Sequence, residues 1–260
     1  MKRSALMAGL VLAAGLALMT AGGASARSLQ SITVSGTMTL CAHPNALPYA
    51  SRYGELPGLQ VEIAEALAKQ IGVTLTRSWV MNAYQFRRTG CDIVLDAIGD
   101  RDALGEVGLR SSRPYHRSGV ALALRRDSAV SSLADLGKEQ RVGVQTGSLA
   151  SMRLAKDGIR ISPFGFEDEI LEALQKGEID AAAVTPGAIG WFNRQHPEAG
   201  LRAIAAFDGD PDLNWNVAVG MISPDDKLRQ RIDAAVEALL ADGTIERAYA
   251  RYGLTFRPPQ

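Results

Sequence analysis

The stretch from Thr37 to Gly72 reads TMTLCAHPNALPYASRYGELPGLQVEIAEALAKQIG and decides the type of fold. Its first six residues predict a short β-strand, which ends at the proline-containing loop that follows. After that loop, apolar residues recur at helical spacing and stop at a glycine; they are Leu59, Ile63, Ala64, Leu67, Ala68 and Ile71, before Gly72. A strand followed by a helix is the unit of a parallel sheet wound with helices, so we expect an α/β fold.

The same alternation continues along the chain. It predicts further strands at 74–79, 91–96, 119–125, 141–145, 180–184 and 216–221. It predicts further helices at 149–156, 166–175, 224–241 and 245–252, the last two capped by Ser223 and Thr244.

Two α/β units of about 100 residues each suit a chain of this length better than one large sheet. We expect lobe 1 at 27–118 and 215–260, and lobe 2 at 119–214. Because no proline- or glycine-rich linker separates them, the hinge is expected to be two strands that cross near Ser118 and Asn214. Ligands bind outside the carboxyl ends of such strands, so two facing lobes would form a cleft.

Composition excludes several classes of function. The 260 residues are 47% hydrophobic, and 28 Lys and Arg balance 28 Asp and Glu, so a nucleic-acid partner is not expected. The three histidines lie far apart in sequence and in no metal-ligand spacing, so we expect no metal site. The chain contains no G-x-S-x-G, H-E-x-x-H, P-loop or G-x-G-x-x-G motif, so we expect no cofactor and no catalytic residues.

The first 26 residues have the three parts of a secretory signal peptide. Lys2 and Arg3 form a positive start, an apolar run covers 5–20, and Ala24-Ser25-Ala26 is a small-x-small cleavage site. An uncleaved membrane anchor is the alternative, although the run is shorter than the roughly 20 residues that a spanning helix needs. We therefore expect a soluble, periplasmic protein that is a monomer when free.

Short motifs that occur in order along the chain carry a family resemblance. They are MTL at 38–40, LPY at 47–49, PGLQVEIA at 57–64, CDIV at 91–94, SRPY at 112–115, LADL at 133–136, VGVQTGS at 142–148, GEIDA at 177–181 and ADGTI at 241–245. In these motifs the chain resembles the type II periplasmic solute-binding proteins of family 3. The resemblance implies two Rossmann-like lobes joined by a two-strand hinge, and capture of a small solute for the membrane subunits of an ABC importer.

The positions with which that family holds an amino acid differ here. The family has an acid after the first strand, a Ser or Thr and an Arg after the third, and an Asp after the strand that contains Asp180. This chain has His43, Gly99, Leu104 and Thr185 at those places, with Arg101 three residues from the Arg position. Opposite charges at fixed places give a zwitterion its charge-assisted hydrogen bonds, so the substitutions argue against a standard amino-acid site.

A narrower branch resembles three segments of the chain, at 40–49, 90–94 and 113–119. It comprises the J-type accessory proteins found with quinoprotein methanol and alcohol dehydrogenases. This resemblance implies a non-catalytic accessory with a quinoprotein dehydrogenase as partner, which is our first hypothesis. The alternative is the importer's solute receptor. A third hypothesis is a dehydratase on the same fold, with Asp96 as its acid or base.

We expect the cleft to be lined by residues that follow strands. The candidates are Asn45, Tyr49, Asp96, Arg101, Gln145, Thr146, Gly147, Ser148 and Thr185. Each has a structural alternative: Ser148 would equally cap a helix, and Asp96 would equally hydrogen-bond a neighbouring loop. Among the aromatic residues, we expect ligand contact for Tyr49 and a core position for Trp79.

Cys41 and Cys91 are the two cysteines, and an even number in an exported protein suggests a disulfide. A parallel register of neighbouring strands would instead place them at opposite ends, about 10 Å apart, which exceeds the span of a disulfide. The sequence leaves both the bridge and two buried thiols open.

Overall fold

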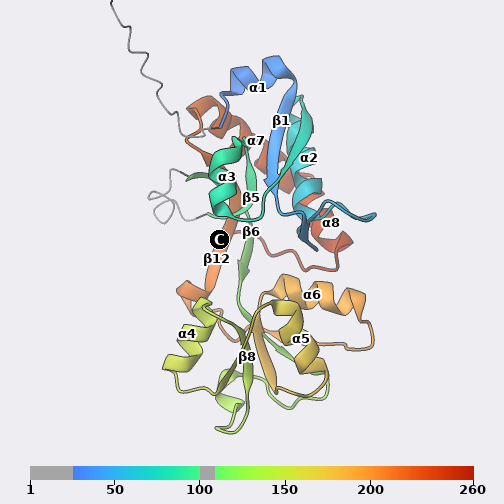
Figure 1. Cartoon of the computed structure of the whole chain (residues 1–260), viewed down its shortest axis with the longest axis vertical. Helices are drawn as coiled ribbons and strands as arrows, with labels where there is room; N and C mark the ends of the chain where they lie inside the picture. Colours follow the sequence, from blue (N-terminus) through green and yellow to red (C-terminus); the bar gives the residue numbers. More distant parts are fainter. Residues whose placement is uncertain (1–25, 100–108) are drawn as a thin grey trace, which may run out of the picture.

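The structure is a computed structural model that describes residues 26–99 and 109–260. Two α/β lobes lie one above the other along the longest axis of the molecule, and β6 and β12 pass between them (Figure 1). All of the expected signal peptide except Ala26 lies outside the described residues. No helix among the described residues is both long and apolar enough to cross a membrane.

Lobe 1 is formed by both ends of the chain. Its helices are α1 (Leu29–Ser35), α2 (Leu59–Ile71), α3 (Ala83–Thr89), α7 (Asp226–Ala241) and α8 (Thr244–Arg251). Its strands are β1 (Thr37–Ala42), β2 (Asn45–Ala46), β3 (Ala50–Ser51), β4 (Thr74–Trp79), β5 (Val94–Ile98), β6 (Leu109–Gly119) and β12 (Asn214–Ile222).

Lobe 2 lies between the two long strands in sequence. Its strands are β7 (Ala121–Leu124), β8 (Val142–Gln145), β9 (Ile161–Phe164), β10 (Ala181–Val184) and β11 (Arg202–Ile204). Its helices are α4 (Leu149–Lys156), α5 (Glu167–Gln175) and α6 (Pro186–Gln195). The expected α/β class is confirmed.

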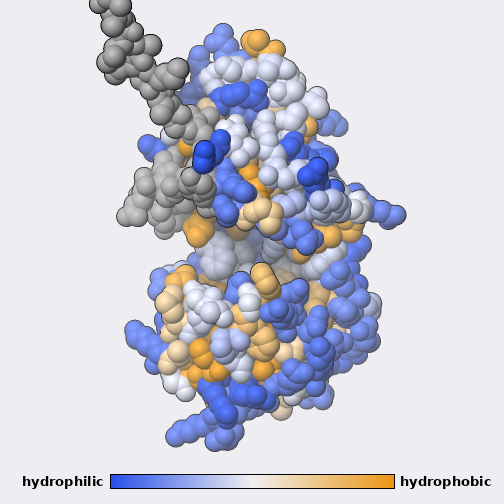
Figure 2. Space-filling model, in the orientation of Figure 1, coloured by the Kyte–Doolittle hydropathy of each residue, from blue (hydrophilic) through white to orange (hydrophobic). Residues whose placement is uncertain are grey.

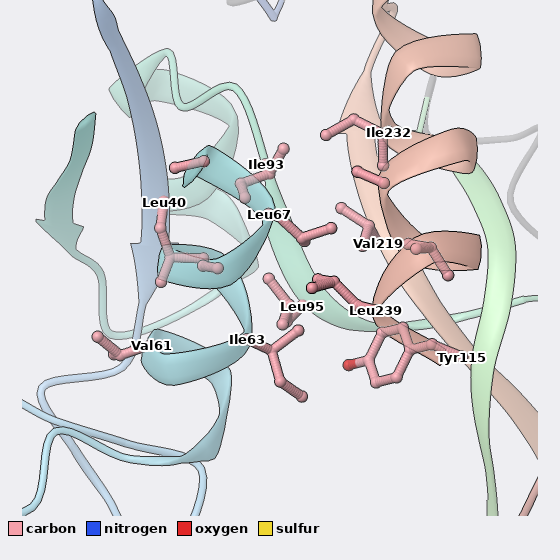
Figure 3. Close-up of a cluster of buried hydrophobic side chains, with 14 of the residues drawn as sticks. Leu40, Val61, Ile63, Leu67, Ile93, Leu95, Tyr115, Val219, Ile232 and Leu239 are labelled. Atoms are coloured by element: carbon pink, nitrogen blue, oxygen red, sulfur yellow. The ribbon is translucent and has the colours of Figure 1, made fainter. Parts of the chain in front are cut away.

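A large hydrophobic core lies at the centre of lobe 1 (Figure 3). The apolar face of α2 contributes Ile63 and Leu67, which pack with Leu40 of β1 and with Leu239 of α7. Strands β1 and β4 pair in parallel, and a bridge from Leu40 to Ile93 aligns the segment that leads into β5 with β1. The carboxyl ends of β1, β4 and β5 therefore lie at one edge of the lobe.

Lobe 2 has a five-stranded sheet in the order β11-β7-β10-β8-β9, in which β10, β8 and β9 are parallel. Side chains of β7 alternate between its two faces, as expected for a strand. Ala121 and Ala123 face the core that contains α5 and α6, whereas Leu122 and Leu124 face the core that contains Leu154 of α4. Both faces of the sheet are thus covered.

β6 and β12, the two long strands that pass between the lobes, pair with each other over most of their length. Register runs from Asn214 opposite Gly119 to Ile222 opposite Leu109, and β6 leads into β7 of lobe 2. The sequence prediction missed most of β6, because arginines interrupt its apolar pattern and the predicted strand begins only at Gly119. It also started the third strand at Cys91, whereas β5 begins at Val94.

Two predicted helix caps are wrong. Asp225, rather than Ser223, caps α7, and its carboxylate accepts a hydrogen bond from the Leu228 amide at 2.6 Å. Thr244 is the first residue of α8 rather than its cap, which is Gly243 in the left-handed conformation. Both corrections move the helix start by one or two residues and leave the helices themselves in place.

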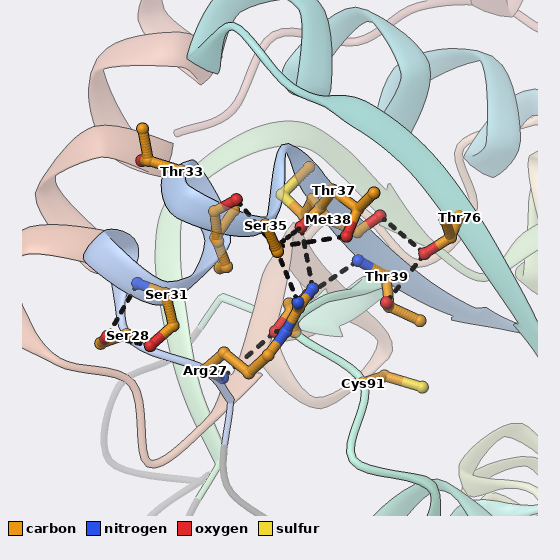
Figure 4. A network of polar contacts seen from close by, with 12 residues as sticks. Arg27, Ser28, Ser31, Thr33, Ser35, Thr37, Met38, Thr39, Thr76 and Cys91 are labelled. Carbon is orange, nitrogen blue, oxygen red and sulfur yellow. Dashed lines mark hydrogen bonds and ion pairs between the residues drawn. The ribbon is translucent and has the colours of Figure 1, made fainter.

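An ion pair between a partly exposed arginine and a buried aspartate fixes the start of the described chain (Figure 4). The fully buried carboxylate of Asp92 accepts hydrogen bonds from the Nε and Nη2 of Arg27, at 3.1 and 2.6 Å, and from the Thr39 amide at 2.7 Å. Arg27 Nη2 also donates to the Thr37 carbonyl oxygen at 2.8 Å. A buried carboxylate is tolerated when it has such partners, so this network ties residue 27 to β1.

Candidate functional site

The edge of lobe 2 that faces lobe 1 is formed by three turns, each of which follows a parallel strand. β8, β9 and β10 end beside one another, and the turns after them begin at Gln145, Phe164 and Val184. The first two turns are joined by hydrogen bonds. The amide and the hydroxyl of Thr146 both donate to the Phe164 carbonyl oxygen at 2.9 Å, and Gln145 Nε2 donates to the Gly165 carbonyl oxygen at 3.2 Å.

Gly147 and Ser148 complete the turn into α4. Gly147 has a φ of +73°, in the left-handed region that favours glycine. The Ser148 hydroxyl accepts a hydrogen bond from the Ser151 amide at 3.1 Å, as an N-cap does. Ser148 is therefore the N-cap of α4, as its structural alternative predicted. Its contact with a ligand stays a prediction.

Thr185 caps α6 and is held by an acid that the sequence analysis did not single out. Its hydroxyl accepts from the Ala188 amide at 3.2 Å and donates to Glu167 Oε2 at 2.8 Å, while its amide donates to Glu167 Oε1 at 2.6 Å. Burial raises the pKa of Glu167, and the hydrogen bonds from Thr185 act in the opposite direction. Glu167 is one of three acids in the first turn of α5, and its position there gives no sign of this contact.

A cavity of about 250 Å³ lies between the lobes. Tyr49 of lobe 1 and Thr185 of lobe 2 both line it, so two of the predicted residues meet there although they are far apart in sequence. The other lining residues come from the crossing strands, the start of α6 and the end of the chain; they are His116, Ser118, Pro186, Gly187, Trp215, Val217, Tyr249, Leu254, Thr255 and Arg257.

Glycines let α6 approach lobe 1 closely. A Cβ at Gly187 would lie 2.4 Å from the Tyr49 hydroxyl oxygen, and one at Gly190 would lie 2.6 Å from the Gly253 carbonyl oxygen. Neither distance is possible for a larger residue without a shift of the backbone or of Tyr49. Further along the same helix, Trp191 packs against Tyr252 of lobe 1, with ring centroids 6.1 Å apart.

His116 is a buried residue of this cavity. Its ring lies 4.2 Å from the Tyr249 ring and 5.8 Å from the Phe256 ring, and its Nδ1 accepts a hydrogen bond from the Arg257 amide at 3.3 Å. Burial lowers the pKa of His116 to about 4, so the imidazole is neutral at pH 7. In the sequence His116 has no metal-ligand spacing to another histidine, and no local motif marks it as buried.

Of the remaining predicted cleft residues, those whose side chains the structure describes do not line this cavity. Gln145 to Ser148 lie at the same edge of lobe 2, and Asn45 lies in the β2–β3 hairpin, opposite Ser51. Asp96 lies within β5, but its side chain is outside the described residues, as is the whole of Arg101. Trp79 is half-buried against the core of lobe 1, in agreement with its predicted core position.

Cys41 and Cys91 are joined by a disulfide with a Cα–Cα distance of 5.6 Å. The alternative separation of about 10 Å assumed that Cys91 lies within a strand paired with β1 along its length. In the structure Leu40 is opposite Ile93 in a single bridge, and Cys91 precedes β5 and lies outside any strand. Among the described residues, no group of three or more His, Cys, Asp or Glu side chains could hold a metal ion.

Comparison with known proteins identifies relatives over nearly the whole chain. The family model of bacterial extracellular solute-binding proteins, family 3, matches residues 38–255. The probable amino-acid-binding protein YxeM of Bacillus subtilis is 26% identical over 94% of this chain and 93% of its own length. The histidine-binding periplasmic protein of Salmonella typhimurium is 24% identical over 97% of each chain.

Solved structures show the same fold. The L-cystine solute receptor of Neisseria gonorrhoeae, in its unliganded open conformation, superimposes with a TM-score of 0.74 at 20% identity, over 90% of this chain and all of that one. An ancestral cationic amino-acid solute-binding protein gives 0.71 at 20% identity, over 86% and 99% of the two chains. The described residues therefore have the two-lobed fold of type II periplasmic binding proteins.

Proposed function

Because this chain belongs to the bacterial extracellular solute-binding proteins of family 3, we propose that it is the substrate-binding component of an ABC importer for a small polar solute. The observation that carries the proposal is the cavity lined by Tyr49 of one lobe and Thr185 of the other. A solute bound there would contact both lobes at once. This reading replaces the dehydrogenase accessory as the leading hypothesis, because the relatives named above bind amino acids.

The proposal includes the organisation and location of the protein. Lobe 1 comprises 27–118 and 215–260, and lobe 2 comprises 119–214, so the solute is held between them. The chain is exported to the periplasm, its first 26 residues are removed, and its partners are the membrane subunits of the importer. It works without a cofactor and changes no covalent bond of the solute.

The experiment is a thermal-shift screen of the mature chain against amino acids, small organic acids and short alcohols. A solute that binds the folded state selectively raises the melting temperature, since binding stabilises that state by mass action.

The variant Tyr49→Ala should weaken binding of the solute found about tenfold, because it removes a wall of the cavity. Tyr53→Ala is the matched control, since Tyr53 is exposed and outside the cavity. Absence of any stabilising solute contradicts the proposal.

The second candidate is the accessory to a quinoprotein methanol or alcohol dehydrogenase. The observation that favours it is the local likeness of segments 40–49, 90–94 and 113–119 to that branch, together with Thr185 where other family members have an aspartate. It predicts co-purification with a periplasmic dehydrogenase and no stabilising solute in the screen. A dehydratase is the third, and it would require turnover that is lost in Asp96→Asn.

A further inference from the structure

Exposed apolar side chains gather at the edges of the two lobes that face each other. Seven large apolar side chains are exposed among the described residues, and five of them lie at or just after the carboxyl ends of β4, β5, β8 and β9, or on the helix that follows. In lobe 2 these are Leu149, Met152 and Phe166, and in lobe 1 they are Met81 and Ile98.

The direction of the strands explains why these residues face the gap. β4 and β5 end at the same edge of lobe 1 as β1, and Met81 and Ile98 are found at those two ends. Ile98 is opposite Val217, which lines the interlobe cavity. On the other side, Phe166 belongs to the turn joined to Gln145 and Thr146. Figure 2 shows apolar colour on both sides of the hollow between the lobes, with α4 on the side of lobe 2.

The exposure of these side chains is high for their type. Phe166 is 66% exposed and Met81 is 58% exposed. Single exposed apolar residues are common, but a concentration on two facing surfaces marks a place where something apolar binds. The polar side chains of the same edge include the neutral groups of Gln145, Thr146 and Thr185. The three carboxylates in the first turn of α5 already accept hydrogen bonds: Glu167 from Thr185, Asp168 from the Glu169 amide, and Glu169 from the Gly165 and Phe166 amides.

We propose that the solute of this protein carries an apolar group, branched aliphatic or aromatic, which packs between Phe166 and Leu149 of lobe 2 and Met81 and Ile98 of lobe 1. Its polar end lies toward Thr185 and Tyr49 at the cavity. The proposal rests on the proposed function and adds the class of solute. Removal of the apolar group and of the four side chains from water stabilises the bound state, because transfer of apolar area out of water is favourable.

The test compares pairs of solutes with the same shape and different polarity. Leucine is paired with asparagine, isopentylamine with 3-aminopropanamide, and 4-methylpentanoate with succinamate, so that each head group occurs with both an isobutyl and a carboxamide end. Binding to the mature chain is measured by calorimetry. For at least one head group we expect the apolar member to bind tenfold or more tightly than its polar partner.

The outcomes separate the two proposals. A polar member that binds as tightly as its apolar partner, or more tightly, overturns the inference and leaves the receptor function standing. If no member of any pair binds, and the broader screen also gives no solute, the proposed function fails and the inference fails with it.

Variants at exposed positions locate the contact. Phe166→Ser should weaken binding of the apolar member at least fivefold, and serine at this position, the N-cap of α5, is compatible with the helix. Val34→Ser is the matched control, because Val34 is 82% exposed on α1, at the end of lobe 1 remote from lobe 2 (Figure 1). Unchanged binding in Phe166→Ser and in Met81→Ser, with melting temperatures equal to that of the wild type, would overturn the assignment.

Discussion

At the scale of the single residue, His116 makes stability depend on pH. The neutral imidazole is buried against the rings of Tyr249 and Phe256 and accepts a hydrogen bond from the Arg257 amide. Its pKa is about 4 in the folded protein against 6.5 in the unfolded chain. Between those values the unfolded chain binds the extra proton, so stability falls as the pH decreases from about 6.5 toward 4 and is unaffected by this group above that range.

We expect His116→Gln to remove this dependence. When the pH falls from 7 to 4.5, the unfolding free energy of the wild type should decrease by about 2 to 3 kcal/mol more than that of the variant. Denaturant unfolding at a series of pH values measures it, with His196→Gln as control, because the His196 side chain is 43% exposed. Parallel pH profiles for wild type and His116→Gln would refute this account of the imidazole.

Single residues were only partly predictable from the sequence. Ser148 could be identified as a helix cap because it follows a strand and precedes an apolar repeat. Glu167 could not be paired with Thr185, since their contact joins two turns that only the parallel sheet brings together. The burial of His116 could not be predicted for the same reason, because it depends on α8 and on the end of the chain, which are distant in sequence.

At the scale of secondary-structure elements, the disulfide joins β1 to the segment that leads into β5. Cys41 and Cys91 are 50 residues apart in sequence, so the bond restricts a loop that contains α2, β4 and α3. In the chain-entropy model a loop of this size contributes about 4 kcal/mol, by reducing the freedom of the unfolded chain.

The double variant Cys41→Ala, Cys91→Ala should therefore unfold with a free energy lower by about 4 kcal/mol, measured by urea denaturation under oxidising conditions. The wild type under reducing conditions is the matched control and should resemble the variant. A loss below about 1 kcal/mol would indicate that the bond is absent or that the unfolded chain is already compact.

Elements with a strong apolar period were predictable, and elements shaped by contact between lobes were not. α2, α5 and α7 have regular apolar repeats and were found. α6 contains Pro186, Gly187 and Gly190, which normally interrupt helices, yet the proline takes the first turn and the glycines permit contact with Tyr49 and Gly253. β6 was missed because arginines separate its buried residues, which include Tyr115 and His116.

At the scale of the whole molecule, the end of the chain connects lobe 1, the crossing strands and lobe 2. The Arg117 amide of β6 donates to the Arg257 carbonyl oxygen, and Gln260 exchanges two hydrogen bonds with Asn216 of β12. The Arg257 guanidinium also lies 3.3 Å from the Asp208 carboxylate of lobe 2. The segment therefore contributes to the relative placement of the lobes on which the cavity depends.

The central claim is that a solute is held between two lobes, and hydrogen–deuterium exchange with and without the tightest-binding solute of the screen tests it most directly. We predict slower exchange in both lobes, at 43–49 of lobe 1 and at 145–148, 164–167 and 185–187 of lobe 2. Protection confined to one lobe, or to surfaces away from these turns, would contradict the claim.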